Sequence, residues 1–95
     1  MEDIEDIVVV IDFTNSKYID DLYRIISEKL DFPEWFGKNL DALWDLLTGY
    51  IDSCEIHIKG IEGLPSDIRP YAEKIYSVFV HAESMYNEIR VKRSV

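Results

Sequence analysis

The chain has 95 residues, 47% hydrophobic and 13% aromatic, a composition that is typical of one globular domain and excludes a disordered tail. Its net charge of −9 lies wholly in residues 1–52, because residues 53–95 contain equal numbers of acidic and basic residues. This asymmetry disfavours binding to nucleic acid or to an anionic membrane and favours a basic partner. A single cysteine, Cys54, excludes an internal disulfide bond.

The start of the chain and its apolar runs give an expectation for location. The opening residues, MEDIEDIVVVIDF, are acidic where a secretory signal needs positive charge. No apolar run approaches the ~20 residues that a membrane-spanning helix needs. We therefore expect a cytoplasmic protein in a reducing environment.

The first strand and the first helix are predicted at residues 7–13 and 17–30. Ile7–Phe13 (IVVVIDF) is a continuous β-branched and aromatic run, which is typical of a strand covered on both faces at the centre of a parallel sheet. Apolar residues then recur with the period of a helix up to Leu30. A loop should follow, in which one of the aromatic residues Trp35 and Phe36 packs inward and the other stays exposed.

A short amphipathic helix with an unusual outer face is predicted next. Asn39 is a suitable N-cap, and Gly49 suits the left-handed residue that closes a helix. Leucines gather on one side, and the other side carries Asp41, Trp44, Asp45 and Thr48. Like charges one turn apart destabilise a helix, so a tryptophan between two acidic residues indicates an interface anchor. The alternative interpretation is a solvated acidic face whose tryptophan folds back onto the core.

Two more strands and the longest helix are predicted in residues 54–95. Cys54–Lys59 alternates polar and apolar residues, so His57 should point outward from a strand with one drier face. An apolar stripe predicts a helix at residues 71–85, and alternation with basic residues predicts an edge strand at residues 88–95. The order β, α, α, β, α, β predicts a single α/β domain over residues 1–95, in which a three-stranded parallel sheet packs against helices.

The segment PEWFGKNLDALWDLLTGY (residues 33–50) resembles the signature of the barstar family, with NLDALWD and LTG intact. Barstars inhibit the secreted ribonuclease barnase inside the cell that makes it, so the resemblance implies the same fold and a role as a ribonuclease inhibitor or immunity protein. It also implies a set of partner-binding residues, which are Trp35, Gly37, Asn39, Asp41, Trp44, Asp45, Thr48, Tyr50 and His81.

Within this set, the resemblance implies that the carboxylate of Asp45 enters the phosphate site of the nuclease. It implies that Asp41 is the second acidic contact and meets a basic residue of the nuclease at the rim. The chain departs from the family at several of these positions. Trp35 stands where barstars usually have tyrosine and Tyr50 where they have tryptophan, while Lys38 and His81 stand where barstars have acidic residues. The last two changes make the surface less negative, which allows a target other than barnase.

Three classes of function follow from these residues. A ribonuclease inhibitor would act as a monomer and bind one basic, barnase-type or related toxin nuclease, with a carboxylate in the place of a phosphate. The alternative is an interaction module that docks another basic protein through the same acidic face. An enzyme is disfavoured, because Asp41 and Asp45 are too solvated to act as an acid/base pair and no nucleophile or phosphate loop accompanies them. We therefore predict no catalytic residue, no metal site and no cofactor.

Overall fold

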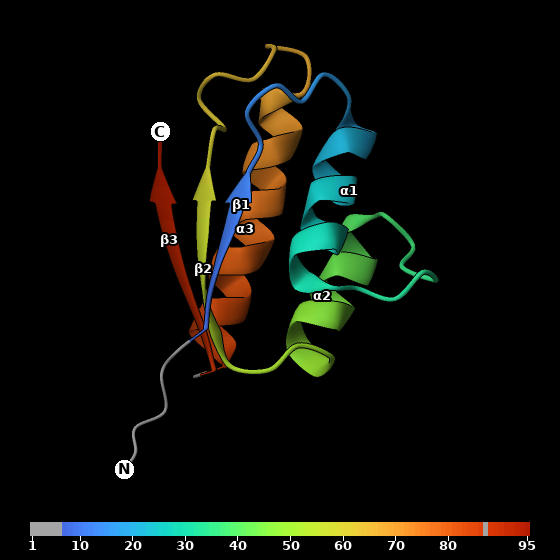
Figure 1. Cartoon of the computed structure of the whole chain (residues 1–95), viewed down its shortest axis with the longest axis vertical. Coiled ribbons are helices and arrows are strands. Elements are labelled where there is room, and N and C mark those ends of the chain that lie inside the picture. Colours follow the sequence, from blue (N-terminus) through green and yellow to red (C-terminus); the bar gives the residue numbers. More distant parts are fainter. Residues whose placement is uncertain (1–6, 87) are drawn as a thin grey trace.

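The computed structural model describes residues 7–86 and 88–95, so the acidic start of the chain, residues 1–6, lies outside the described residues. The described chain contains the elements β1 (Val8–Asp12), α1 (Ile19–Leu30), α2 (Leu40–Gly49), β2 (Cys54–Lys59), α3 (Arg69–Met85) and β3 (Ile89–Ser94) (Figure 1). The strands pair in the order β1-β2-β3, and both pairs are parallel. These findings confirm the predicted α/β fold with a three-stranded parallel sheet.

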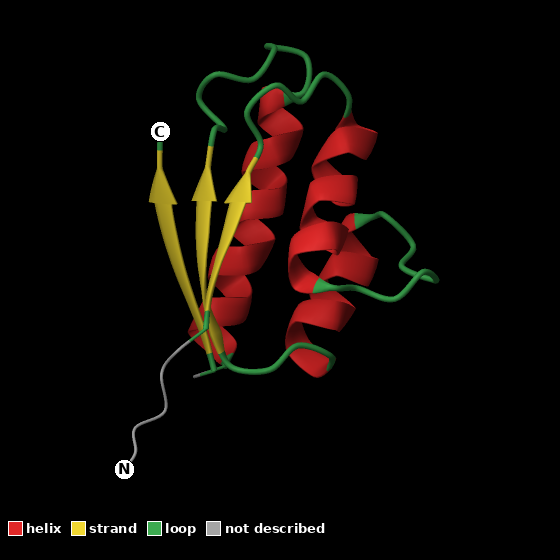
Figure 2. Cartoon of the chain, in the orientation of Figure 1, coloured by secondary structure: helices red, strands yellow, loops and turns green. Residues whose placement is uncertain are grey.

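β1 is an edge strand, and the prediction that residues 7–13 form a central strand covered on both faces is wrong. Its inward side chains are covered, since Ile11 is fully buried, but Val8 and Val10 on the outer face are 52% and 44% exposed. The described helices pack against one face of the sheet only (Figure 2). An apolar run therefore does not guarantee burial on both faces, because the described helices cover only one face of this sheet.

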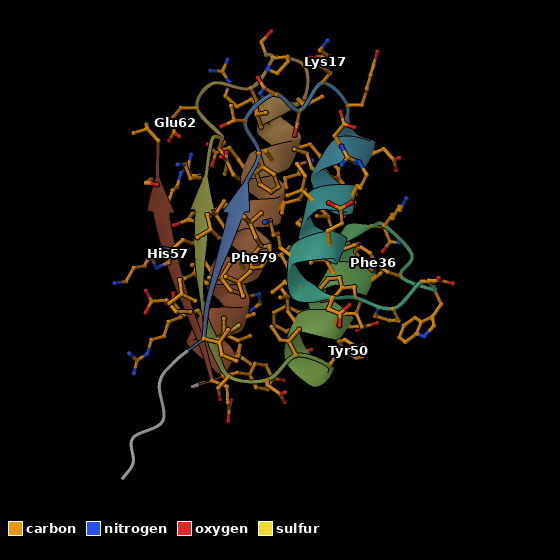
Figure 3. The ribbon with its side chains drawn as sticks, viewed as in Figure 1. Lys17, Phe36, Tyr50, His57, Glu62 and Phe79 are labelled. Atoms are coloured by element: carbon orange, nitrogen blue, oxygen red, sulfur yellow. The ribbon has the colours of Figure 1, made fainter. Side chains whose placement is uncertain are left out.

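The core fills the space between the sheet and the helices. Ile56 and Ile58 of β2 point into it, and Phe79 of α3 packs against them from the helical layer, fully buried (Figure 3). Leu43 and Leu47 bring the apolar side of α2 into the same core, as its pattern predicts. Burial of these side chains removes apolar surface from water, which is the main force that holds α2 in place.

A group of paired charges, the Arg93 cluster, fastens β3 to α3. The guanidinium of Arg93 donates two hydrogen bonds to the carboxylate of Glu73, at 2.8 and 2.7 Å, and one to Glu62 at 2.9 Å. It also lies over the ring of Tyr76, 4.7 Å from the ring centre. The bidentate hydrogen bond from Arg93 holds the pKa of the Glu73 carboxyl below its ordinary value. These charges thus stabilise the fold.

Candidate functional site

The ends of α2 are set by local hydrogen bonds. The side chain of Asn39 accepts a bond from the N–H of Ala42 at 2.8 Å, so the predicted N-cap is confirmed. At the other end, Gly49 is still helical and its φ is not positive, so the prediction that it closes the helix in the left-handed conformation is wrong. Tyr50 ends the helix instead, and its N–H donates to the carbonyl of Leu46 at 3.0 Å. These hydrogen bonds therefore fix both ends of α2 and, with them, the orientation of its outer face.

Asp41 and Asp45 lie exposed on that outer face. In the described part of the chain, neither carboxylate has a hydrogen bond or an ion pair. Lys38 precedes Asp41 by a turn, but its ammonium group pairs with Asp20 of α1 at 3.6 Å. Both carboxylates are thus hydrated and available to a partner, at the cost of their mutual repulsion.

The two tryptophans of this region differ in exposure. Trp44 is half-buried and packs against the core, so the alternative interpretation, that it folds back, holds for this residue. One face of its ring stacks on His81 of α3, with ring centres 4.8 Å apart and planes tilted by 36°. Trp35, in the loop before α2, is 73% exposed. Of the two tryptophans, Trp35 is therefore the one that stands exposed beside α2.

The loop before α2 is held by the residue next to Trp35. Phe36 is only 7% exposed and packs edge-on against Phe32 and Tyr23, with ring centres 5.0 and 5.8 Å apart. Figure 3 shows Phe36 directed toward the helices. Of the two candidates, Phe36 thus packs inward, and this buried ring leaves Trp35 on the outside of the loop.

A groove of about 510 Å³ separates this loop from α2. Asp45 lines this groove together with the aromatic residues Trp35 and Tyr50. A Cβ added to Gly49 would contact nothing within 4 Å, so the missing side chain leaves the groove open. The complete lining is Trp35, Gly37, Ala42, Asp45, Leu46, Gly49 and Tyr50.

The groove brings together four of the predicted site residues and adds three. Trp35, Gly37, Asp45 and Tyr50 were in the predicted set, whereas Ala42, Leu46 and Gly49 were not. Gly49 follows Asp45 by four residues on the same helix, and this spacing is the signal that could have identified it.

The other predicted residues lie outside the groove. Trp44 and His81 form the stacked pair, and Asp41 stands exposed on α2. The two remaining residues, Asn39 and Thr48, use their polar side chains locally. Asn39 caps α2, and the hydroxyl of Thr48 donates to the carbonyl of Trp44 at 2.8 Å. Neither is free to form the same bond with a partner.

A second hollow and a paired histidine lie elsewhere in the described chain. A larger hollow of about 770 Å³ lies by the loops that follow β1 and β2, but it contains none of the predicted site residues. His57 is half-exposed on β2 between buried neighbours, which confirms its outward direction, and it pairs with Glu55. Within residues 7–86 and 88–95, no three His, Cys, Asp or Glu side chains are grouped as metal ligands, and no helix is long and apolar enough to cross a membrane.

Comparisons with known proteins agree on one family. The family model described as "Barstar (barnase inhibitor)" matches residues 7–95. The chain is also 34% identical over 85 residues to the Bacillus subtilis (strain 168) protein named "Putative ribonuclease inhibitor YrdF". The matched region covers 87% of this chain and 93% of that protein. Together with the parallel three-stranded sheet and the acidic helix, these matches show that the chain belongs to the barstar family.

Proposed function

We propose that this chain inhibits a basic ribonuclease by placing the acidic face of α2 in its active site. The observation that carries the proposal is the carboxylate of Asp45, which is exposed, unpaired among the described residues and set on the wall of an aromatic groove. A ribonuclease binds phosphates with basic side chains, which form strong bidentate bonds to a carboxylate as well. Asp45 would therefore occupy the place of a substrate phosphate.

Rigidity of α2 supports this mechanism. Its leucine side is buried in the core and its first turn is capped by Asn39. A group that is already held in its bound position loses little conformational entropy on binding, so more of the interaction energy contributes to affinity. Trp35, which lines the groove and is exposed, supplies the large aromatic contact that is common at the centre of tight interfaces.

The family supports a ribonuclease as the partner, and the relative from Bacillus subtilis carries the name of a ribonuclease inhibitor. In this proposal the chain acts as a monomer, binds one ribonuclease molecule and blocks its active site by occlusion. It would serve in the bacterial cytoplasm as an immunity protein against a ribonuclease toxin.

A titration of barnase activity with the purified chain tests the proposal. Wild type should abolish activity at a sharp equivalence point, and Asp45→Ala should weaken binding by about 2–5 kcal/mol, because it leaves a basic group of the nuclease buried without its partner. Asp67→Ala is the matched control, since Asp67 is an exposed acid in the loop before α3 and outside the α2 face. Equal inhibition by both variants would contradict the role of Asp45. Binding without inhibition would favour the interaction module.

A further inference from the structure

The two edges of the sheet differ in whether their backbone groups are already bonded, and the edge at β3 is closed. Just before β3, the carbonyl of Glu88 accepts a hydrogen bond from β2 at 2.9 Å. Neighbouring residues of a strand direct their backbone groups to opposite sides, so those of Ile89 and Val91 face the outer edge. The N–H of Val91 donates to the carboxylate of Glu83 at 2.9 Å. The N–H of Ile89 donates to the carbonyl of Tyr86, the C-cap of α3, at 3.4 Å.

The opposite edge, at β1, is open. The carbonyl of Ile7 and the N–H of Phe13 both bond to β2, at 2.8 and 2.9 Å. By the same alternation, the N–H and C=O groups of Val8 and Val10 face away from β2. Among the described residues these groups have no hydrogen-bond partner, because β1 pairs with β2 alone. Unpaired backbone groups of this kind are a template for an added strand.

The outer face of the sheet, which the described helices leave uncovered, is apolar only along β1 (Figure 2). Val8 and Val10 lie exposed there. The positions beside them are polar or charged, namely Glu55 and His57 on β2 and Arg90 and Lys92 on β3. A partner that lay across the whole face would therefore meet charges, whereas a strand added alongside β1 would meet valines. This pattern favours docking at the edge by strand addition.

We propose that β1 pairs in antiparallel orientation with β1 of a second copy of this chain, which joins the two three-stranded sheets into one. An added strand must supply free backbone groups and uncharged, β-branched side chains. The β1 edge of another copy supplies both, because residues 7–11 are IVVVI. Val8 and Val10 of the two copies would form an apolar centre, with the charges of β2 and β3 as a polar rim.

The symmetry of this contact limits the assembly to a dimer. An antiparallel pair uses the same edge of both copies, so no β1 edge is left for a third copy. The edges that remain outside are those of β3, which α3 has closed through Glu83 and Tyr86. The contact involves one short strand from each copy and is small beside the ~1,200–2,000 Å² of a stable interface. The dimer should therefore be weak, and at lower concentrations the chain is the monomer of the proposed function.

Sedimentation velocity of the whole chain tests the proposal between about 10 μM and about 1 mM, because self-association depends on protein concentration. Wild type should change from monomer to dimer across this range and should form no larger species. Raised salt should strengthen the dimer, since the net charge of −9 makes two copies repel each other at low ionic strength.

Val10→Lys should weaken the dimer about tenfold or more, because like charges would then meet across the contact. The same change lowers the net negative charge, which by itself favours association, so a weaker dimer identifies the edge as the contact. Val80→Lys is the matched control, since Val80 lies on α3 and is 37% exposed, against 44% for Val10. It should leave the dimer intact. Thermal unfolding of both variants checks that the fold is retained.

Amide hydrogen exchange of wild type locates the contact without a mutation. The N–H groups of Val8 and Val10 should exchange several times more slowly at the high end of the concentration range than at the low end. Those of Val9 and Ile11 face β2 and should change little. Equal behaviour of the two sets would contradict pairing at this edge.

A chain that stays monomeric at every concentration would overturn the inference and would leave an extended segment of a different protein as the occupant of the β1 edge. A dimer that Val10→Lys does not weaken would overturn it as well. The inference does not rest on the proposed function, because neither experiment contains a ribonuclease. Loss of the dimer leaves the inhibition titration with Asp45→Ala untouched, and a failed titration leaves the dimer standing.

Discussion

The Arg93 cluster and the outer face of α2 use charged side chains in opposite ways. Arg93 forms ion pairs with Glu73 and Glu62 and fastens β3 to α3. On α2, Asp41 and Asp45 have no such partner in the described chain. Paired charges contribute to the stability of the fold, whereas unpaired carboxylates on a fixed helix contribute only when a partner neutralises them. The two regions therefore differ in what a mutation should change, namely the free energy of unfolding or the affinity.

Neighbouring aromatic residues of the loop before α2 should give the largest contrast. Phe36→Ala should lower the free energy of unfolding by about 3–5 kcal/mol, because it leaves a cavity in the core. Trp35→Ala should change it by less than about 0.5 kcal/mol, as expected for an exposed residue, and should instead weaken ribonuclease binding. Chemical denaturation and an inhibition titration of both variants would check this. A large loss of stability in Trp35→Ala would contradict the division between the two residues.

Arg93→Ala should destabilise the fold by about 1–3 kcal/mol, because it removes charge-assisted hydrogen bonds that are partly exposed to water. Affinity for the ribonuclease should stay unchanged, since β3 and the Arg93 cluster lie outside the α2 face. Denaturation with urea gives the first quantity and an inhibition titration the second. The matched control is Arg24→Ala on α1, whose exposed pair with Asp21 at 3.3 Å should matter less. A loss of affinity in Arg93→Ala would show that the two regions are coupled.

Acid should weaken the Arg93 cluster in a defined pH range. The hydrogen bonds from Arg93 lower the pKa of Glu73 in the folded chain below its ordinary value of 4.5. The stabilisation is therefore fully present above the unfolded pKa and is lost as the pH falls through the lower folded pKa. Unfolding free energies measured from pH 6 down to pH 3 should fall more steeply for wild type than for Arg93→Ala. Parallel curves would mean that Glu73 does not contribute.

Much of the fold and of α2 could be predicted from the sequence because the signals are local. The leucine spacing and Asn39 determine the buried side and the start of α2, and both predictions are confirmed. The position of β1 could not be predicted, since an apolar run looks the same in a central strand and in an edge strand that leaves Val8 and Val10 exposed. That difference depends on how many layers cover the sheet.

Site residues that depend on contacts between elements were harder to predict. The exposure of Trp44 is decided by α3, where His81 covers one face of its ring. Likewise, Lys38 pairs with Asp20, which is distant in sequence. The family resemblance supplied Trp35 and His81 as site residues, but only the packing of Phe36 shows which aromatic side chain of the loop is exposed.

The most direct test of the account measures two free energies for Asp45→Ala, that of unfolding and that of binding to the ribonuclease. Removal of one of two like charges a turn apart should leave stability unchanged or raise it by about 0.2–0.5 kcal/mol. Binding should weaken by about 2–5 kcal/mol in the same variant. This combination would establish that the carboxylate serves the partner and not the fold. Reduced stability with unchanged affinity would contradict the central claim.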